Sequence, residues 1–352
     1  MGRRRLLLVV LLLALIAGVW WARRSPVRYP EAYIADRSAA LWSATAQVRR
    51  QVATLGYGEK VSVLGRTADL TEVRSADGTH GWIDSRLLMA PELWSRVGQL
   101  LSDARNMPVQ AWGHTRTVSN VHIEPGRDSA RIFQFGRNVP VAVLQRQVAA
   151  VPTTTSSDEG RSGDEAPPPG DEKSAEEDWA LVMFSQAKAS AAASASGSAG
   201  AQADTGRSVP IAGWVLARFI ELDPPAPIGD YTAAAGRKVA AWVQLNTVAD
   251  ASGEKPQYMV AATKGGEGQP CDFTSVRVYT WGVEHKRYET SFVDNNLCGR
   301  LPVRVTQTPA GPEFRFSDDK SVEHAYRLMQ TVVRRIGPPV PARGQRNRTA
   351  PR

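Results

Sequence analysis

The chain has 352 residues, of which 42% are hydrophobic and ten are Trp, enough for two or three domains with apolar cores. Its net charge of +8 is concentrated at the two ends, with six Arg in residues 1–28 and four after Gly337. Because the chain shows no basic stripe with interleaved aromatic residues, the sequence argues against nucleic-acid binding.

The N-terminus has the pattern of a membrane anchor. Three Arg residues precede an apolar run from Leu6 to Ala22, with Trp20 and Trp21 at its far edge. As a helix this run would span about 25 Å, the short end of what a bilayer needs. Removal as a signal peptide is the alternative, but the small residues that cleavage requires are not well placed. We therefore expect a signal anchor over residues 1–28 and a single-pass inner-membrane protein with a periplasmic bulk.

Two stretches of the chain repeat one pattern. "GWIDSRLL" begins at Gly81 and "GWVLARFI" begins at Gly213, and each pairs Gly-Trp with a β-branched residue. Upstream of them, residues 55–66 and 133–144 each combine an aromatic residue, Gly, two polar residues and a strand-like run. Asp77-Gly78 is a strong tight-turn signal between strands. Each stretch is therefore predicted to be a set of short antiparallel strands closing into a small barrel.

Both units resemble the bacterial Src-homology-3-like domain family. The pattern comprises an aromatic entry, a Gly-polar-polar-Val strand and a closing Gly-Trp-Val, and residues 120–144 match it better than residues 39–65 do. The resemblance implies a first barrel over 32–90 and a second over 117–223. It implies a fold more reliably than it implies a ligand.

The second barrel is expected to carry two long insertions. Residues 151–178 are acidic and rich in Pro, and residues 185–208 consist mainly of Ala, Ser and Gly. Neither has an apolar period that could bury a face, so both are predicted to be disordered loops flanking the strand "DWALVMF".

A connecting helix is predicted over residues 91–108. Pro91 and Glu92 are typical of a helix start, apolar residues recur at helical spacing, and Pro108 ends the pattern. We expect the helix to pack one barrel on the next, with a free partner-binding helix as the alternative.

The C-terminal region is predicted to be an antiparallel β-meander over residues 236–337, followed by a disordered basic tail over 338–352. Six strand-like runs alternate in polarity and are separated by turns. Residues 321–336 fit a helix and a hairpin equally well. The overall expectation is thus a mainly β chain with an N-terminal transmembrane helix, two small barrels and this meander domain.

Binding is the function expected from the resemblance, because Src-homology-3-like grooves are lined by aromatic residues that hold extended peptides. The ligand would be cell-wall peptide or a protein partner of the envelope, and we expect no enzymatic activity, cofactor or metal. Core packing is the alternative role for every aromatic candidate, above all for Trp82 of "GWIDSRLL" and Trp214 of "GWVLARFI". The candidates are Trp42, Tyr57, Trp82, Phe135, Trp179 and Trp214.

Two alternatives to binding remain open at this stage. Related barrels often accompany cell-wall cysteine peptidases, and Cys271 with His285 could supply a nucleophile and a base. Cys271 precedes strand-like sequence rather than a helix, however, and in an oxidising compartment it would pair with Cys298. The other alternative is a purely structural spacer.

Overall fold

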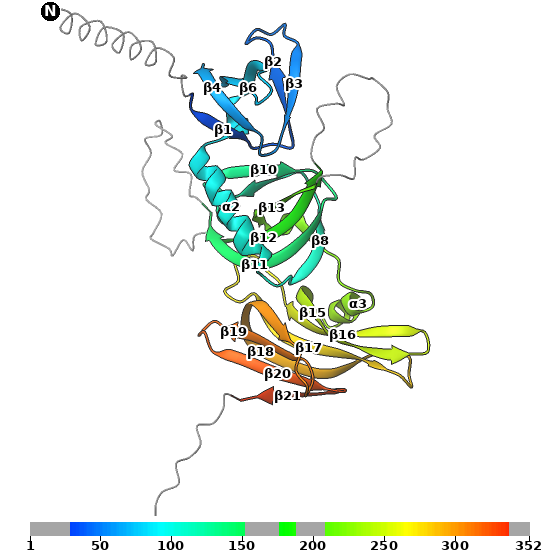
Figure 1. Ribbon diagram of the computed structural model, residues 1–352. Coiled ribbons are helices and arrows are strands. Elements are labelled where there is room, and N and C mark those ends of the chain that lie inside the picture. Colours follow the sequence, from blue (N-terminus) through cyan, green and yellow to red (C-terminus); the bar gives the residue numbers. More distant parts are fainter. Residues whose placement is uncertain (1–28, 152–175, 188–207, 338–352) are drawn as a thin grey trace, which may run out of the picture.

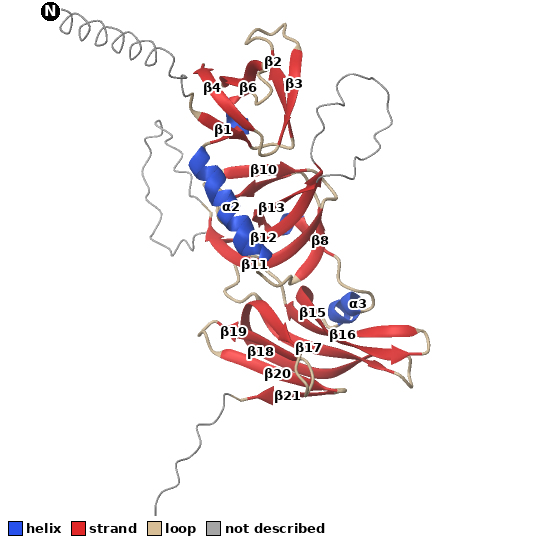
Figure 2. Cartoon of the chain, viewed as in Figure 1, coloured by secondary structure: helices blue, strands red, loops and turns tan. Residues whose placement is uncertain are grey.

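The computed structural model describes residues 29–151, 176–187 and 208–337. In this part of the chain the protein is mainly β, with three seven-stranded antiparallel sheets stacked one after another (Figures 1 and 2). We call the first sheet the first unit (residues 31–89), the second sheet the second unit (111–222), and α3 with the third sheet the C-terminal unit (228–336).

The first unit has the strand order β3-β2-β6-β5-β4-β1-β7. Alternating burial, as at Val61 and Val63 of β4, sends one face of each strand into a shared core. The strands are β1 (Glu31–Ile34), β2 (Ser38–Trp42), β3 (Gln51–Gly56), β4 (Lys60–Arg66), β5 (Leu70–Arg74), β6 (His80–Asp84) and β7 (Leu88–Met89), with a 3-10 turn η1 (Ser85–Leu87) before β7.

The second unit repeats this order strand for strand, as β10-β9-β13-β12-β11-β8-β14. The predicted tandem repeat is therefore visible as repeated topology. The strands are β8 (Ala111–Thr115), β9 (Ser119–His122), β10 (Arg131–Phe135), β11 (Pro140–Ala150), β12 (Glu176–Ala187), β13 (Ser208–Leu216) and β14 (Ile220–Leu222), with η3 (Ala217–Phe219) before β14.

The two Gly-Trp phrases mark the same point in both units. Trp82 is the one residue of β6 paired with β2, opposite Trp42, and Trp214 is the one residue of β13 paired with β9, opposite His122. Each of these two sheets is thus a two-stranded hairpin joined to five further strands through a single residue pair. The expectation of closed barrels is wrong for the described residues, because the edge strands of each order do not pair with each other.

The insertions are shorter than predicted. β12 begins at Glu176 and ends at Ala187, and it takes in three acidic residues that we had assigned to the first insertion. Ala150 pairs with Glu176 and Ala187 with Ser208, so each insertion replaces a hairpin turn. Residues 152–175 and 188–207 themselves lie outside the described part of the chain, as does the predicted tail over 338–352.

The connecting helix is present as α2 (Pro91–Arg105) and lies across the second sheet (Figure 1). Pro91 occupies its first turn, where the missing N–H costs nothing, and Val97 and Ala104 are its buried residues. Near its start, the Trp94 ring stacks on Tyr33 with 5.1 Å between centroids, which fixes α2 to the first unit. The helix therefore packs the two units together, as expected.

The C-terminal unit is a meander in which the strands pair in chain order, from β15 to β21. The ambiguous end is a hairpin, turning at Gln330 with a φ of 54°. Its elements are α3 (Ile228–Ala234), β15 (Lys238–Asp250), β16 (Gly253–Thr263), β17 (Phe273–Gly282), β18 (Arg287–Thr306), β19 (Glu313–Asp318), β20 (Glu323–Met329) and β21 (Val332–Ile336).

The expectation of a membrane-spanning anchor is not supported by the described residues. Residues 1–28 lie outside the described part of the chain, and in the described ranges no helix has the length and apolar character needed to cross a bilayer. The expectation of a single-pass inner-membrane protein is therefore not kept.

Candidate functional site

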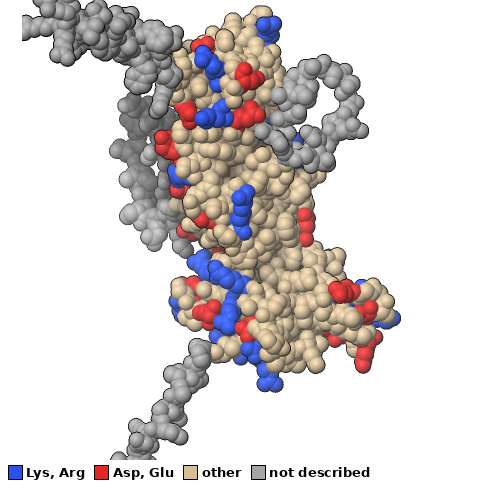
Figure 3. All heavy atoms as spheres, in the orientation of Figure 1, with Lys and Arg blue, Asp and Glu red and all other residues tan. Residues whose placement is uncertain are grey.

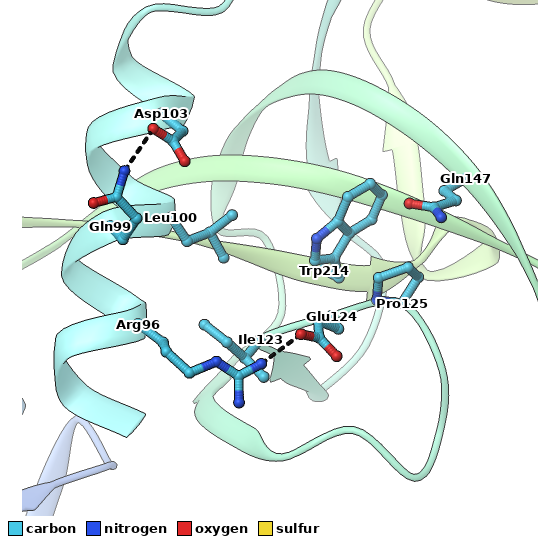
Figure 4. Close-up of a pocket in the computed structure, with 9 residues that line it drawn as sticks. All are labelled: Arg96, Gln99, Leu100, Asp103, Ile123, Glu124, Pro125, Gln147 and Trp214. Atoms are coloured by element: carbon cyan, nitrogen blue, oxygen red, sulfur yellow. Dashed lines mark hydrogen bonds and ion pairs between the residues drawn. The ribbon is translucent and has the colours of Figure 1, made fainter. Parts of the chain in front are cut away.

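An open groove of about 590 Å³ runs between α2 and the second sheet (Figure 4). One wall is the face of α2, and the opposite wall is the segment that follows β9. Its lining residues are Arg96, Gln99, Leu100, Asp103, Ile123, Glu124, Pro125, Gln147 and Trp214.

The floor of the groove is apolar and contains one unused hydrogen-bond donor. Trp214 is 7% exposed and packs in the same core cluster as Leu144 and Leu181. Leu100 and Ile123 lie between α2 and the Trp214 ring (Figure 4). The indole N–H of Trp214 makes no hydrogen bond to another described residue, and it is not one of the buried polar atoms that lack a partner, so it is open to water in the groove. A ligand lying in the groove could replace that water with an acceptor of its own.

The rim is polar and carries charges of both signs. Arg96 Nη2 lies 2.5 Å from Glu124 Oε1, and their side chains are 53% and 65% exposed. Gln99 donates to Asp103 Oδ1 at 3.0 Å, while Gln147 is exposed on β11. Exposed pairs of this kind contribute little to stability, so their donors and acceptors can exchange to a ligand at low cost.

The rim and floor together have the chemistry of a peptide groove. Apolar side chains can pack on the Trp214 floor, while amide and carboxylate groups on both sides can hydrogen-bond to an extended backbone. The helical pattern of residues 91–108 is the signal in the sequence that indicates this site. Sequence reasoning nevertheless missed Leu100, Gln99 and Ile123, because nothing local shows that α2 faces Trp214.

Three of the predicted aromatic candidates are packing residues. Tyr57, Phe135 and Trp179 are 7%, 2% and 1% exposed. Tyr57 contacts Phe133 edge-on at 5.1 Å between centroids, and burial raises the pKa of its phenol. Trp179 contacts His122 in the same way at 5.2 Å. Tyr57 packs the first unit on the second, whereas Phe135 and Trp179 pack within the second unit, and none of the three lines the groove.

The remaining candidates, Trp42 and Trp82, are half-buried neighbours on the first sheet. The Arg49 guanidinium lies over the Trp42 ring, 4.7 Å from its centroid. The structure therefore separates the six candidates: Trp214 lines the groove of the second unit, and this pair lies in the first unit.

The residues suggested for peptidase chemistry are not brought together. Cys271 is joined to Cys298 in a disulfide, as the sequence analysis expected. His285 lies in the turn after β17 and its Nδ1 is 2.7 Å from Glu289, whereas Cys271 precedes β17. The ten-residue strand between them spans about 30 Å. In the ranges 29–151, 176–187 and 208–337, no three His, Cys, Asp or Glu side chains cluster as a metal site would require.

Comparisons with known proteins leave the family open. No family model matches the chain, and no curated protein matches it. Among solved structures, NlpC2 from Trichomonas vaginalis is similar at 10% identity, with 86% of this chain and 97% of that chain covered and a TM-score of 0.16. NlpC1 from the same organism is similar at 9% identity, with 76% and 92% covered and a TM-score of 0.16. Likenesses this distant carry no argument about fold or activity.

Proposed function

We propose that the protein is a binding module that holds an extended peptide in the groove between α2 and the second sheet. The observation that carries this proposal is the Trp214 floor, where an apolar surface and an indole N–H open to the groove lie beside exposed polar groups. The ligand is a cell-wall peptide or an extended segment of a protein partner, in keeping with the resemblance to Src-homology-3-like domains.

Binding is favoured over peptidase activity by the state of the thiols. The chain has two Cys residues, and both are in the disulfide, so neither sulfur is available as a nucleophile. The distance between Cys271 and His285 along β17 points the same way.

The test compares Trp214→Phe with Trp82→Phe in the full-length chain. Both substitutions keep an aromatic ring and remove the indole N–H, and the two positions are equivalent in the repeated topology. Binding to purified peptidoglycan and to an array of extended peptides would be measured for both, with circular dichroism as a check on folding. We expect Trp214→Phe to weaken binding about tenfold and Trp82→Phe to leave it unchanged.

A second pair of variants tests the rim. Arg96→Ala and Arg287→Ala each remove an exposed Arg with one Glu neighbour, but Arg287 lies on the β17–β18 hairpin of the C-terminal unit. Only Arg96→Ala is expected to weaken binding. Equal affinities for wild type, Trp214→Phe and Arg96→Ala, or no binding to any of the ligands, would contradict the proposed function.

A further inference from the structure

A larger cavity, of about 890 Å³, lies between the second unit and the C-terminal unit. It is separate from the α2 groove and shares none of its lining residues. Ala180 of β12, Ile220 of β14 and Val239 of β15 contribute to an apolar wall. Ten charged side chains also line the cavity, and their pairing decides which ligand it suits.

One group of these charges is already satisfied. Arg146 places Nη2 2.5 Å from Asp178 and Nη1 2.8 Å from Asp272, and the three side chains are 13%, 15% and 3% exposed. Arg146 also donates to the main-chain oxygen of Gln269 at 2.9 Å. This buried cluster joins the two units and forms a closed, structural end of the cavity.

A second group is satisfied at the mouth. Arg218 Nη1 lies 2.8 Å from Glu177 and 3.2 Å from Glu267. Arg116 lies 3.8 Å from Glu221. These cations have carboxylate neighbours in the protein and do not need a ligand to balance them.

Two cations remain without a carboxylate partner in the described part of the chain. Arg237 donates only to neutral oxygens, Thr274 Oγ1 at 3.3 Å and Asn295 Oδ1 at 3.1 Å. The side chain of Lys238, the next residue, is exposed and has no hydrogen bond or ion pair within the described ranges, and the same holds for the side chain of Asp230 on α3. The ten lining charges are five of each sign, and at this end Arg237, Lys238 and Asp230 leave one positive charge in excess. On the face seen in Figure 3, Lys and Arg side chains gather where the second unit meets the C-terminal unit.

The Gly-rich sequence "TKGGEGQP" lies against these cations. Gly265 and Gly266 line the cavity with φ of +88° and +115°, a backbone region that favours glycine. A Cβ on Gly265 would lie 3.3 Å from Cδ of Lys238, so the loop approaches the Lys238 side chain closely. The loop thus holds the Lys238 stem at the edge of the cavity.

We propose that this cavity is a second ligand site, one that binds a small molecule with a single carboxylate. The carboxylate is held by Arg237 and Lys238, and the apolar part of the ligand lies against the wall formed by Ala180, Ile220 and Val239. A single negative charge balances the one excess cation, whereas the second charge of a phosphate would face the Asp230 carboxylate.

The probe for this site is acetyl-alanyl-alanine, compared with its C-terminal amide, titrated into the full-length chain by isothermal calorimetry. The two peptides differ only in the terminal charge. We expect saturable binding of the acid and binding of the amide that is about tenfold weaker. The double variant Arg237→Gln/Lys238→Gln should weaken binding of the acid by a similar factor.

The matched control is Lys286→Gln/Arg287→Gln, which removes an adjacent Lys-Arg pair from the exposed β17–β18 hairpin and should bind like wild type. Equal binding of acid and amide, no effect of the Arg237→Gln/Lys238→Gln variant, or binding of inorganic phosphate but not of the acid would overturn the proposal. Because the α2 groove residues are unchanged in these variants, peptide binding there is scored separately with Trp214→Phe.

Discussion

At the scale of single residues, Glu177 shows how an acidic stretch can hide a structural carboxylate. It lies on β12 and is 5% exposed, although the composition around it predicted a disordered loop. Arg127 donates to it from Nε at 2.8 Å, and Arg218 donates at 2.8 Å. Hydrogen bonds from Arg127, and then from Arg218, lower the pKa of Glu177 from 4.5 to about 2.

Glu177→Gln is expected to reduce the free energy of unfolding by about 2 kcal/mol at neutral pH. Because the pKa is lower in the folded protein, the carboxylate stabilises it fully above its ordinary pKa of 4.5 and loses this contribution as the pH falls towards about 2. The difference between variant and wild type should therefore shrink over that window. Urea denaturation at several pH values measures it, and a difference independent of pH would contradict the assignment.

At the scale of elements, each Gly-Trp pair lies where the two-stranded hairpin of its sheet meets the other five strands. A Cβ on Gly213 would lie 2.3 Å from Val121 Cγ1 and 3.0 Å from the His122 main-chain oxygen. A Cβ on Gly81 would likewise lie 2.6 Å from the Trp42 main-chain oxygen. Glycine lets the hairpin cross closely at both positions, and the Trp that follows forms the single residue pair between the parts.

Gly213→Ala and Gly98→Ala should therefore have opposite effects on stability. At Gly213 the added methyl group meets Val121 and backbone, and we expect a loss of about 1–3 kcal/mol. Gly98 lies within α2 with nothing within 4 Å of its Cβ position, so Ala there should stabilise the helix by about 0.5–1 kcal/mol. Chemical denaturation of both variants tests this, and unchanged or increased stability of Gly213→Ala would show that the close crossing is not what Gly213 serves.

Local patterns predicted the elements better than they predicted how the elements meet. Alternation identified β4 through Val61 and Val63, and helical spacing after Pro91 identified α2. The ends of β12 could not be predicted, because Glu177 is polar and its Arg partners come from distant segments. Trp214 was proposed from its phrase alone, but the groove above it depends on the placement of α2, which is set by packing.

At the scale of the whole molecule, one apolar cluster runs through all three units. It includes Tyr57 of the first unit, Phe133 and Phe184 of the second, and Trp242 and Tyr279 of the C-terminal unit. Barrels joined only by linkers would have separate cores. The continuous cluster implies that the groove and the cavity are both held by contacts between units, so that stability and ligand binding are coupled.

Gln110 is the polar counterpart of that cluster. It is fully buried between α2 and β8, and its side-chain amide pairs with the backbone of Val303 on β18. Gln110 Nε2 donates to the Val303 oxygen at 3.1 Å, and Gln110 Oε1 accepts from the Val303 nitrogen at 2.7 Å. Its own main-chain oxygen accepts from Trp242 N at 2.8 Å. Through these three hydrogen bonds Gln110 joins the second unit to β15 and β18 of the C-terminal unit.

Gln110→Ala should uncouple the unfolding of the second and C-terminal units. The substitution leaves the buried N–H and C=O of Val303 unpaired, which costs about 2–3 kcal/mol at the junction. We expect scanning calorimetry to show one cooperative transition for wild type and two resolved transitions, the first at lower temperature, for the variant. Gln51→Ala, which removes an exposed amide bonded to Thr54 in the first unit, should leave the profile unchanged. A single transition at the wild-type temperature in Gln110→Ala would mean that the apolar cluster alone couples the units.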